Sequence, residues 1–152
     1  MPSVEDTKKI HFYFLKKCNS LKNRTILKAF LLKLLKKEGV KFKSLNYIFC
    51  SDAYLLDINK RFLNHDYYTD ILTFVFSKAN DPVDGEIYIS LDRVKENSKT
   101  YKSSFTYELH RVVFHGVLHL SGYSDNGHKN AAIMRNMEEK YLSLYNHVSR
   151  ET

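Results

Sequence analysis

Four short segments rich in aromatic and β-branched residues constrain the fold of this chain most, because each is typical of a β-strand. They lie at 10–14, 45–50, 69–76 and 86–90. Helical periodicity marks other parts of the chain, at 22–38, from 51 to about 62, soon after 90, at 104–120 and at 130–147. We therefore expect an α+β fold, in which helices pack around a small mixed β-sheet of about four strands.

The length and the terminal residues suggest one domain outside the membrane. The chain has 152 residues, which suits a single domain over residues 1–152. It contains no apolar run long enough for a transmembrane helix. Glu5 and Asp6 stand where an export signal would carry basic and then apolar residues. Cys18 and Cys50 are isolated, as expected of reduced thiols. We therefore expect a cytoplasmic protein with no membrane partner.

Positive charge is concentrated in the first third of the chain. Residues 1–50 contain 12 Lys and Arg against 3 acidic residues, whereas residues 51–152 contain 12 against 14. This asymmetry indicates a polyanionic partner, either a nucleic acid or an acidic membrane surface. The lysines of helix 22–38 lie away from its apolar stripe, so they form either a phosphate-binding surface or a simply solvated face. The candidate RNA-binding residues are Lys33, Lys36 and Lys37.

Two histidines four residues apart, His115 and His119, lie on the predicted helix 104–120. This spacing places both side chains on one helix face, one turn apart, where they can bind the same metal ion. Gly122 allows the chain to reverse after the helix, so that the next few residues return toward the pair. The candidates for a third ligand in that segment are Asp125 and His128.

The neighbours of the histidine pair narrow the interpretation. Apolar residues surround the pair, which favours a metal site on a central helix over two unrelated histidines. Peptide-cleaving zinc enzymes carry a glutamate directly after the first histidine as general base, and this chain has Gly116 there. The motif therefore argues against that class of hydrolase. His110 is out of line with His115, and we expect it to face solvent or to make a structural hydrogen bond.

The segment from His115 to Tyr123, with the sequence HGVLHLSGY, resembles the signature of the YbeY family of bacterial metal-dependent endoribonucleases. The resemblance extends over roughly residues 45–145, in the right order. The segment TDILTF at 69–74 resembles the family's TDVLSF strand, and GEIYIS at 85–90 resembles its GDI-x-IS strand. Further matches are Asn59 on the preceding helix and Met137 with Glu138 on the last helix.

The resemblance implies a cytoplasmic enzyme that cuts single-stranded RNA near the 3′ end of small-subunit rRNA, in ribosome maturation and quality control. Its partners would be RNA and the small ribosomal subunit, with no DNA and no membrane. The family's metal ligands are histidines in the pattern H-x3-H-x5-H, which map onto His115, His119 and Asp125. One Zn²⁺ per chain is therefore implied, with a metal-bound water as the proposed attacking group. A family arginine six residues before the TDVLSF threonine is replaced by Leu63.

The residues leave two questions open. Family register favours Asp125 as the third ligand, whereas the affinity of imidazole for Zn²⁺ favours His128. The arginine replaced by Leu63 leaves room for a metal-stabilised RNA-binding assembly factor with little catalysis. A metal-dependent hydrolase of another substrate, built on a similar helix, is the remaining alternative.

Overall fold

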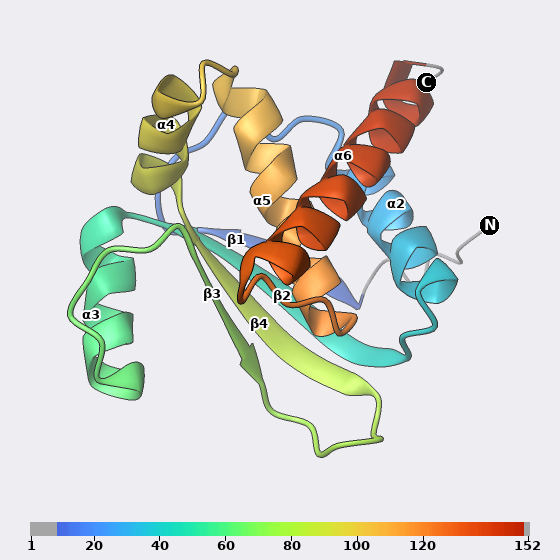
Figure 1. The fold of residues 1–152 in the computed structure, drawn as a ribbon, viewed down its shortest axis with the longest axis horizontal. Coiled ribbons are helices and arrows are strands. Elements are labelled where there is room, and N and C mark those ends of the chain that lie inside the picture. The colour runs from blue at the N-terminus through green and yellow to red at the C-terminus, as the bar shows by residue number, and fades with distance from the viewer. Residues whose placement is uncertain (1–8, 151–152) are drawn as a thin grey trace.

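The computed structural model describes residues 9–150 and arranges them as a four-stranded mixed sheet with helices packed around it (Figure 1). This confirms the α+β fold expected from the sequence. The strands are β1 (Ile10–Phe14), β2 (Phe42–Cys50), β3 (Ile71–Val75) and β4 (Val83–Ser90). The helices are α2 (Arg24–Lys37), α3 (Asp52–Leu63), α4 (Leu91–Thr100), α5 (Phe105–Leu120) and α6 (His128–Arg150).

The spatial order of the strands is β1-β2-β4-β3, and only the last pair is antiparallel. β2 and β4 both begin three residues earlier than the sequence predicts, because Phe42 pairs with Val83 ahead of a register shift. This extension depends on a neighbouring strand, so local composition does not reveal it. β3 is shorter than predicted and forms the edge of the sheet, with Ile71 opposite Ile89.

Helices cover both faces of the sheet. Figure 1 shows α5 between α4 and α6 on one face. On β3, Ile71 points toward α5, while the ring of Phe74, three residues later, packs against Phe62 of α3 at 6.3 Å between centroids. Because side chains alternate along a strand, α3 covers the opposite face from α5. Among residues 9–150, no helix combines the length and apolar character that crossing a bilayer requires.

Gly116 sets the close approach of α5 to the sheet. A Cβ atom built at this position would lie 2.9 Å from Cδ1 of Ile87 and 3.2 Å from Cδ1 of Ile71. Gly116 therefore faces β3 and β4 and not solvent. The glutamate that zinc peptidases carry at this position would meet the sheet, which agrees with the sequence argument against that class.

We predict that Gly116→Ala lowers the free energy of unfolding by about 1 kcal/mol, because overpacking a core outweighs the gain in helix propensity. Urea denaturation measures this change. Ile87→Val removes the nearest methyl group, so Gly116→Ala should cost less in that background than alone. Equal costs in the two backgrounds would contradict the account of the α5–sheet contact.

Candidate metal centre

A pocket of about 440 Å³ lies where α5, the start of β3 and the segment after α5 meet. Three of the four predicted ligands, His115, His119 and Asp125, line this pocket. Leu63, which stands in the place of the family arginine, also lines it. The two helical histidines and the aspartate therefore line one pocket, in which His115 and Asp125 also contact each other.

His115 is held in a defined orientation. Its Nδ1 atom lies 2.6 Å from Oε2 of Glu138, and its Nε2 atom lies 3.6 Å from Oδ2 of Asp125. Because an ionised carboxylate only accepts hydrogen bonds, Nδ1 donates to Glu138. In the neutral imidazole this leaves the Nε2 lone pair on the side of Asp125, where it can bind a metal. Burial alone would lower the pKa of His115, but Glu138, Asp125 and Asp70 outweigh that effect and raise it.

His119 and Asp125 are exposed side chains at the rim of the pocket. Gly122 has a φ of 103°, and the backbone N–H of Tyr123 donates to the carbonyl of Leu118. The chain therefore reverses at Gly122, as the sequence predicts, and returns Asp125 to the side of His115. This reversal is what brings a loop carboxylate to the helix face that carries His115.

Within residues 9–150, no three His, Cys, Asp or Glu side chains are arranged to hold a metal as they stand. The chemistry of the donors nevertheless fits a divalent metal such as zinc. Two imidazoles and a carboxylate are a common ligand set, and a carboxylate on the second nitrogen of a ligating histidine is the usual support. His119 and Asp125 are exposed, so rotation of their side chains toward His115 requires no repacking of the core.

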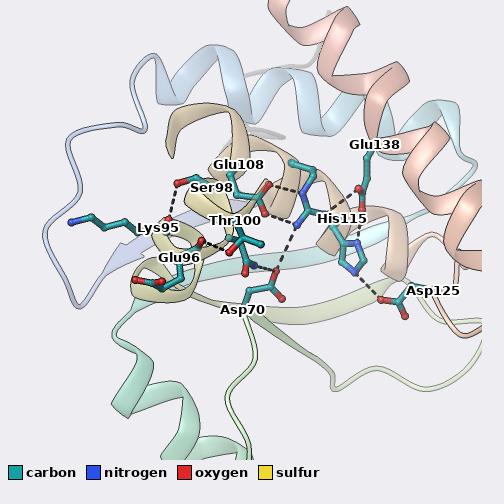
Figure 2. A network of polar contacts seen from close by, with 11 residues as sticks. Asp70, Lys95, Glu96, Ser98, Thr100, Glu108, His115, Asp125 and Glu138 are labelled. Carbon is teal, nitrogen blue, oxygen red and sulfur yellow. Dashed lines mark hydrogen bonds and ion pairs between the residues drawn. The ribbon is translucent and has the colours of Figure 1, made fainter. Parts of the chain in front are cut away.

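Arg111 connects the pocket to a buried group of carboxylates. Its guanidinium donates to both oxygens of Glu108, at 2.9 and 2.6 Å, and to Oε1 of Glu138 at 3.1 Å. Asp70 lies 3.7 Å away. Figure 2 shows these three carboxylates converging, with His115 below Glu138 and Asp125 beyond it.

The sequence patterns alone predict no role for Arg111, Glu108 or Asp70, and Glu138 stands out only as a family match. One signal was present in the sequence. Glu108, Arg111 and His115 recur at helical spacing on one face of α5. Glu138 comes from α6, and its approach to His115 depends on how two helices pack.

Negative charge dominates the pocket and its support. Asp70, Glu108, Asp125 and Glu138 supply four carboxyl groups, and Arg111 is the only Lys or Arg that lines the pocket among the described residues. Burial raises the pKa of Asp70, although the Arg111 charge opposes the shift. Such a site attracts a divalent cation and repels a phosphate group that arrives without one.

The other predicted residues lie outside this pocket. His128 is the exposed first residue of α6 and is not part of the lining. His110 makes the structural hydrogen bond that was one of its two expected roles. Its Nδ1 atom lies 2.8 Å from the carbonyl oxygen of Thr106, and its ring packs near Phe114 and Tyr145. Burial lowers the pKa of His110.

The lysines predicted to bind RNA are exposed on one face of α2. They are Lys33, Lys36 and Lys37. Glu38, directly after the helix, accepts hydrogen bonds from the hydroxyls of Tyr123 at 2.6 Å and Tyr141 at 2.5 Å. Burial would raise the pKa of Glu38, but these two bonds and nearby lysines lower it. The end of α2 is thus tied to Tyr123, two residues before Asp125.

Comparisons with known proteins agree with the fold and the motifs. The family model described as Endoribonuclease YbeY matches residues 12–146. A Cytophaga hutchinsonii protein named Endoribonuclease YbeY is 48% identical over 124 residues, which are 82% of this chain and 87% of that protein. A Flavobacterium psychrophilum protein of the same name is 46% identical over 110 residues, covering 72% and 75% of the two chains. The solution structure of a Thermotoga maritima protein matches with a TM-score of 0.60 at 30% identity and covers 92% of each chain.

Proposed function

The chain belongs to the YbeY family, and from that premise we propose that it is a metal-dependent endoribonuclease acting on single-stranded RNA. The proposed enzyme is one domain over residues 1–152 and works in the cytoplasm. Its proposed substrate is small-subunit rRNA, near the 3′ end, during ribosome maturation and quality control. The names of the relatives support the endoribonuclease activity. The resemblance of the motifs to those of the family supports small-subunit rRNA as the substrate.

The observation that carries this proposal is the setting of His115. Nδ1 of His115 donates a hydrogen bond to Glu138, so that the lone pair of Nε2 is available in an acidic pocket beside Asp125. The proposed ligands of one Zn²⁺ per chain are His115, His119 and Asp125. When bound, such an ion lowers the pKa of a coordinated water to about 7 and stabilises charge on a phosphate oxygen.

The RNA backbone must be held by positively charged side chains, and these lie on α2 more than in the pocket. Arg111 is the only Lys or Arg in the described lining, and its guanidinium is engaged by Glu108 and Glu138. Leu63 leaves the position of the family arginine apolar. We therefore assign the RNA backbone to cations outside the pocket, and the lysines of α2 are the proposed contacts.

Removal of the metal should abolish cleavage of a single-stranded RNA oligonucleotide. Activity should return when Zn²⁺ is added back, because hydrolysis requires a metal and no protein nucleophile. Gel analysis of the products measures both steps. His115→Ala should remain inactive after Zn²⁺ is added, whereas Cys18→Ser with Cys50→Ser should cleave normally. Full cleavage by protein verified to be metal-free would refute the proposed chemistry.

The two candidates for the third ligand can be separated by metal analysis. Asp125→Ala should lose most of the zinc that the unaltered chain retains after dialysis, because Asp125 lies 3.6 Å from Nε2 of His115. His128→Ala should retain it, because His128 does not line the pocket. The reverse pattern, with zinc kept in Asp125→Ala and lost in His128→Ala, would show that the assignment is wrong.

Replacement of Lys33, Lys36 and Lys37 together by Gln should weaken RNA binding and flatten its salt dependence. If each lysine contacts one phosphate, the slope of log K against log salt concentration, which is negative, should become less negative by about 2. Fluorescence anisotropy with a labelled RNA measures the slope. A matched triple replacement of the exposed Lys95, Lys99 and Lys102 by Gln changes the net charge equally. This control should leave the salt dependence of RNA binding unchanged. Equal slopes in both variants would show that the α2 lysines form a solvated face and do not bind the RNA phosphates specifically.

A further inference from the structure

The two carboxylate oxygens of Glu138 have different partners. Oε1 accepts a hydrogen bond from Nη1 of Arg111 at 3.1 Å, and Oε2 accepts one from Nδ1 of His115 at 2.6 Å. Glu138 is only 4% exposed, so solvent has little access to its carboxylate. This residue of α6 is therefore clamped between two side chains of α5.

Arg111 is itself fixed. Nε and Nη2 donate to the two oxygens of Glu108, which is 2% exposed, and Nη2 also faces Asp70 at 3.7 Å. A planar guanidinium bound through two parallel hydrogen bonds keeps its remaining donors in a set direction. Nη1 consequently points at Glu138, and each of the three guanidinium nitrogens of Arg111 donates to a carboxylate oxygen.

This arrangement determines which nitrogen of His115 carries the proton. A guanidinium only donates, so the atom of residue 138 that faces Arg111 must be an acceptor. A carboxylate still has a second acceptor for His115, and a neutral imidazole has one proton to give. The proton then stays on Nδ1, and the lone pair stays on Nε2 in the pocket.

We propose that Arg111 is a positioning residue, which acts through Glu138 to keep the proton of His115 on Nδ1 and so presents Nε2 for metal binding. This proposal rests on the metal site proposed above. It also gives Arg111 a role different from that of the family arginine replaced by Leu63. Arg111 lines the pocket, and its three guanidinium nitrogens donate to Glu108 and Glu138 of the chain itself.

Glu138→Gln tests the proposal with almost no change of shape. A glutamine has one oxygen, and Arg111 requires it, so the amide NH₂ must face His115. Nδ1 then has to accept, and the proton moves to Nε2, which can no longer bind a metal while it carries that proton. Nitrogen-15 NMR of the metal-free full chain, above the pKa of His115, reports the tautomer directly. We expect protonated Nδ1 in the unaltered chain and protonated Nε2 in the variant.

The same variant should bind Zn²⁺ about 10–100-fold more weakly, measured by competition with a chromophoric chelator. Glu139→Gln is the matched control, because Glu139 is the exposed neighbour on the same helix, and it should change neither the tautomer nor the affinity. An unchanged affinity and tautomer in Glu138→Gln would overturn the proposal. So would protonated Nε2 in the unaltered chain, a result that requires no variant.

A triple variant built on Glu138→Gln isolates the contribution of Arg111. Adding Glu108→Gln and Arg111→Met to Glu138→Gln removes the charges of Glu108, Arg111 and Glu138 together. Asp70, which faces Arg111 at 3.7 Å, keeps its hydrogen bond from Nδ2 of Asn97. The glutamine at 138 is then able to turn its oxygen to His115, so Nδ1 should regain the proton and Zn²⁺ affinity should rise above that of Glu138→Gln. If the proton remains on Nε2 of His115 in the triple variant, Arg111 does not set the orientation of the side chain at position 138.

The metal site itself is tested separately. If His115→Ala binds Zn²⁺ as tightly as the unaltered chain, the proposed ligand set is wrong. The tautomer measurements on metal-free protein do not depend on that result, and they still decide whether Arg111 and Glu138 position the proton.

Discussion

The site depends on a buried ion pair, in which the guanidinium of Arg111 is shared by the carboxylates of Glu108 and Glu138. An unpaired carboxylate in the protein interior is costly, by several kcal/mol, so α5 and α6 are favoured in the relative position that satisfies both groups. His115 lies one helical turn beyond Arg111 and therefore meets the same Glu138. The packing of two helices thus sets the orientation of His115, the first of the proposed metal ligands.

The charges of the molecule support the proposed division between cation binding in the pocket and RNA binding on α2. The pocket and its support carry four carboxyl groups around one engaged arginine, a setting that favours a divalent cation and disfavours bare phosphate. The exposed lysines lie on α2. Glu38 joins the end of that helix to Tyr123 and Tyr141. The end of α2 is therefore linked directly to the segment that leads to Asp125.

Much of the fold and part of the site could be predicted from the sequence, because both follow from local periodicity. Helical spacing predicted that His115 and His119 share a face, and Gly122 predicted the reversal that returns Asp125. The early starts of β2 and β4 were not predictable, because each is stabilised by the other. The contact between His115 and Glu138 could not be predicted either. Glu138 is 23 residues away in the sequence and reaches His115 only because α6 packs on α5.

X-ray absorption spectroscopy at the zinc edge tests the central claim, that histidines of α5 and a loop carboxylate hold the metal. For the full chain loaded with one equivalent of Zn²⁺, the account predicts nitrogen and oxygen ligands at about 2.0–2.2 Å, with the outer-shell scattering of two imidazoles. Replacement of His115 by Ala should remove the scattering of one imidazole. A sulfur ligand at about 2.3 Å, which would implicate Cys18 or Cys50, or two imidazoles retained in His115→Ala, would contradict the account.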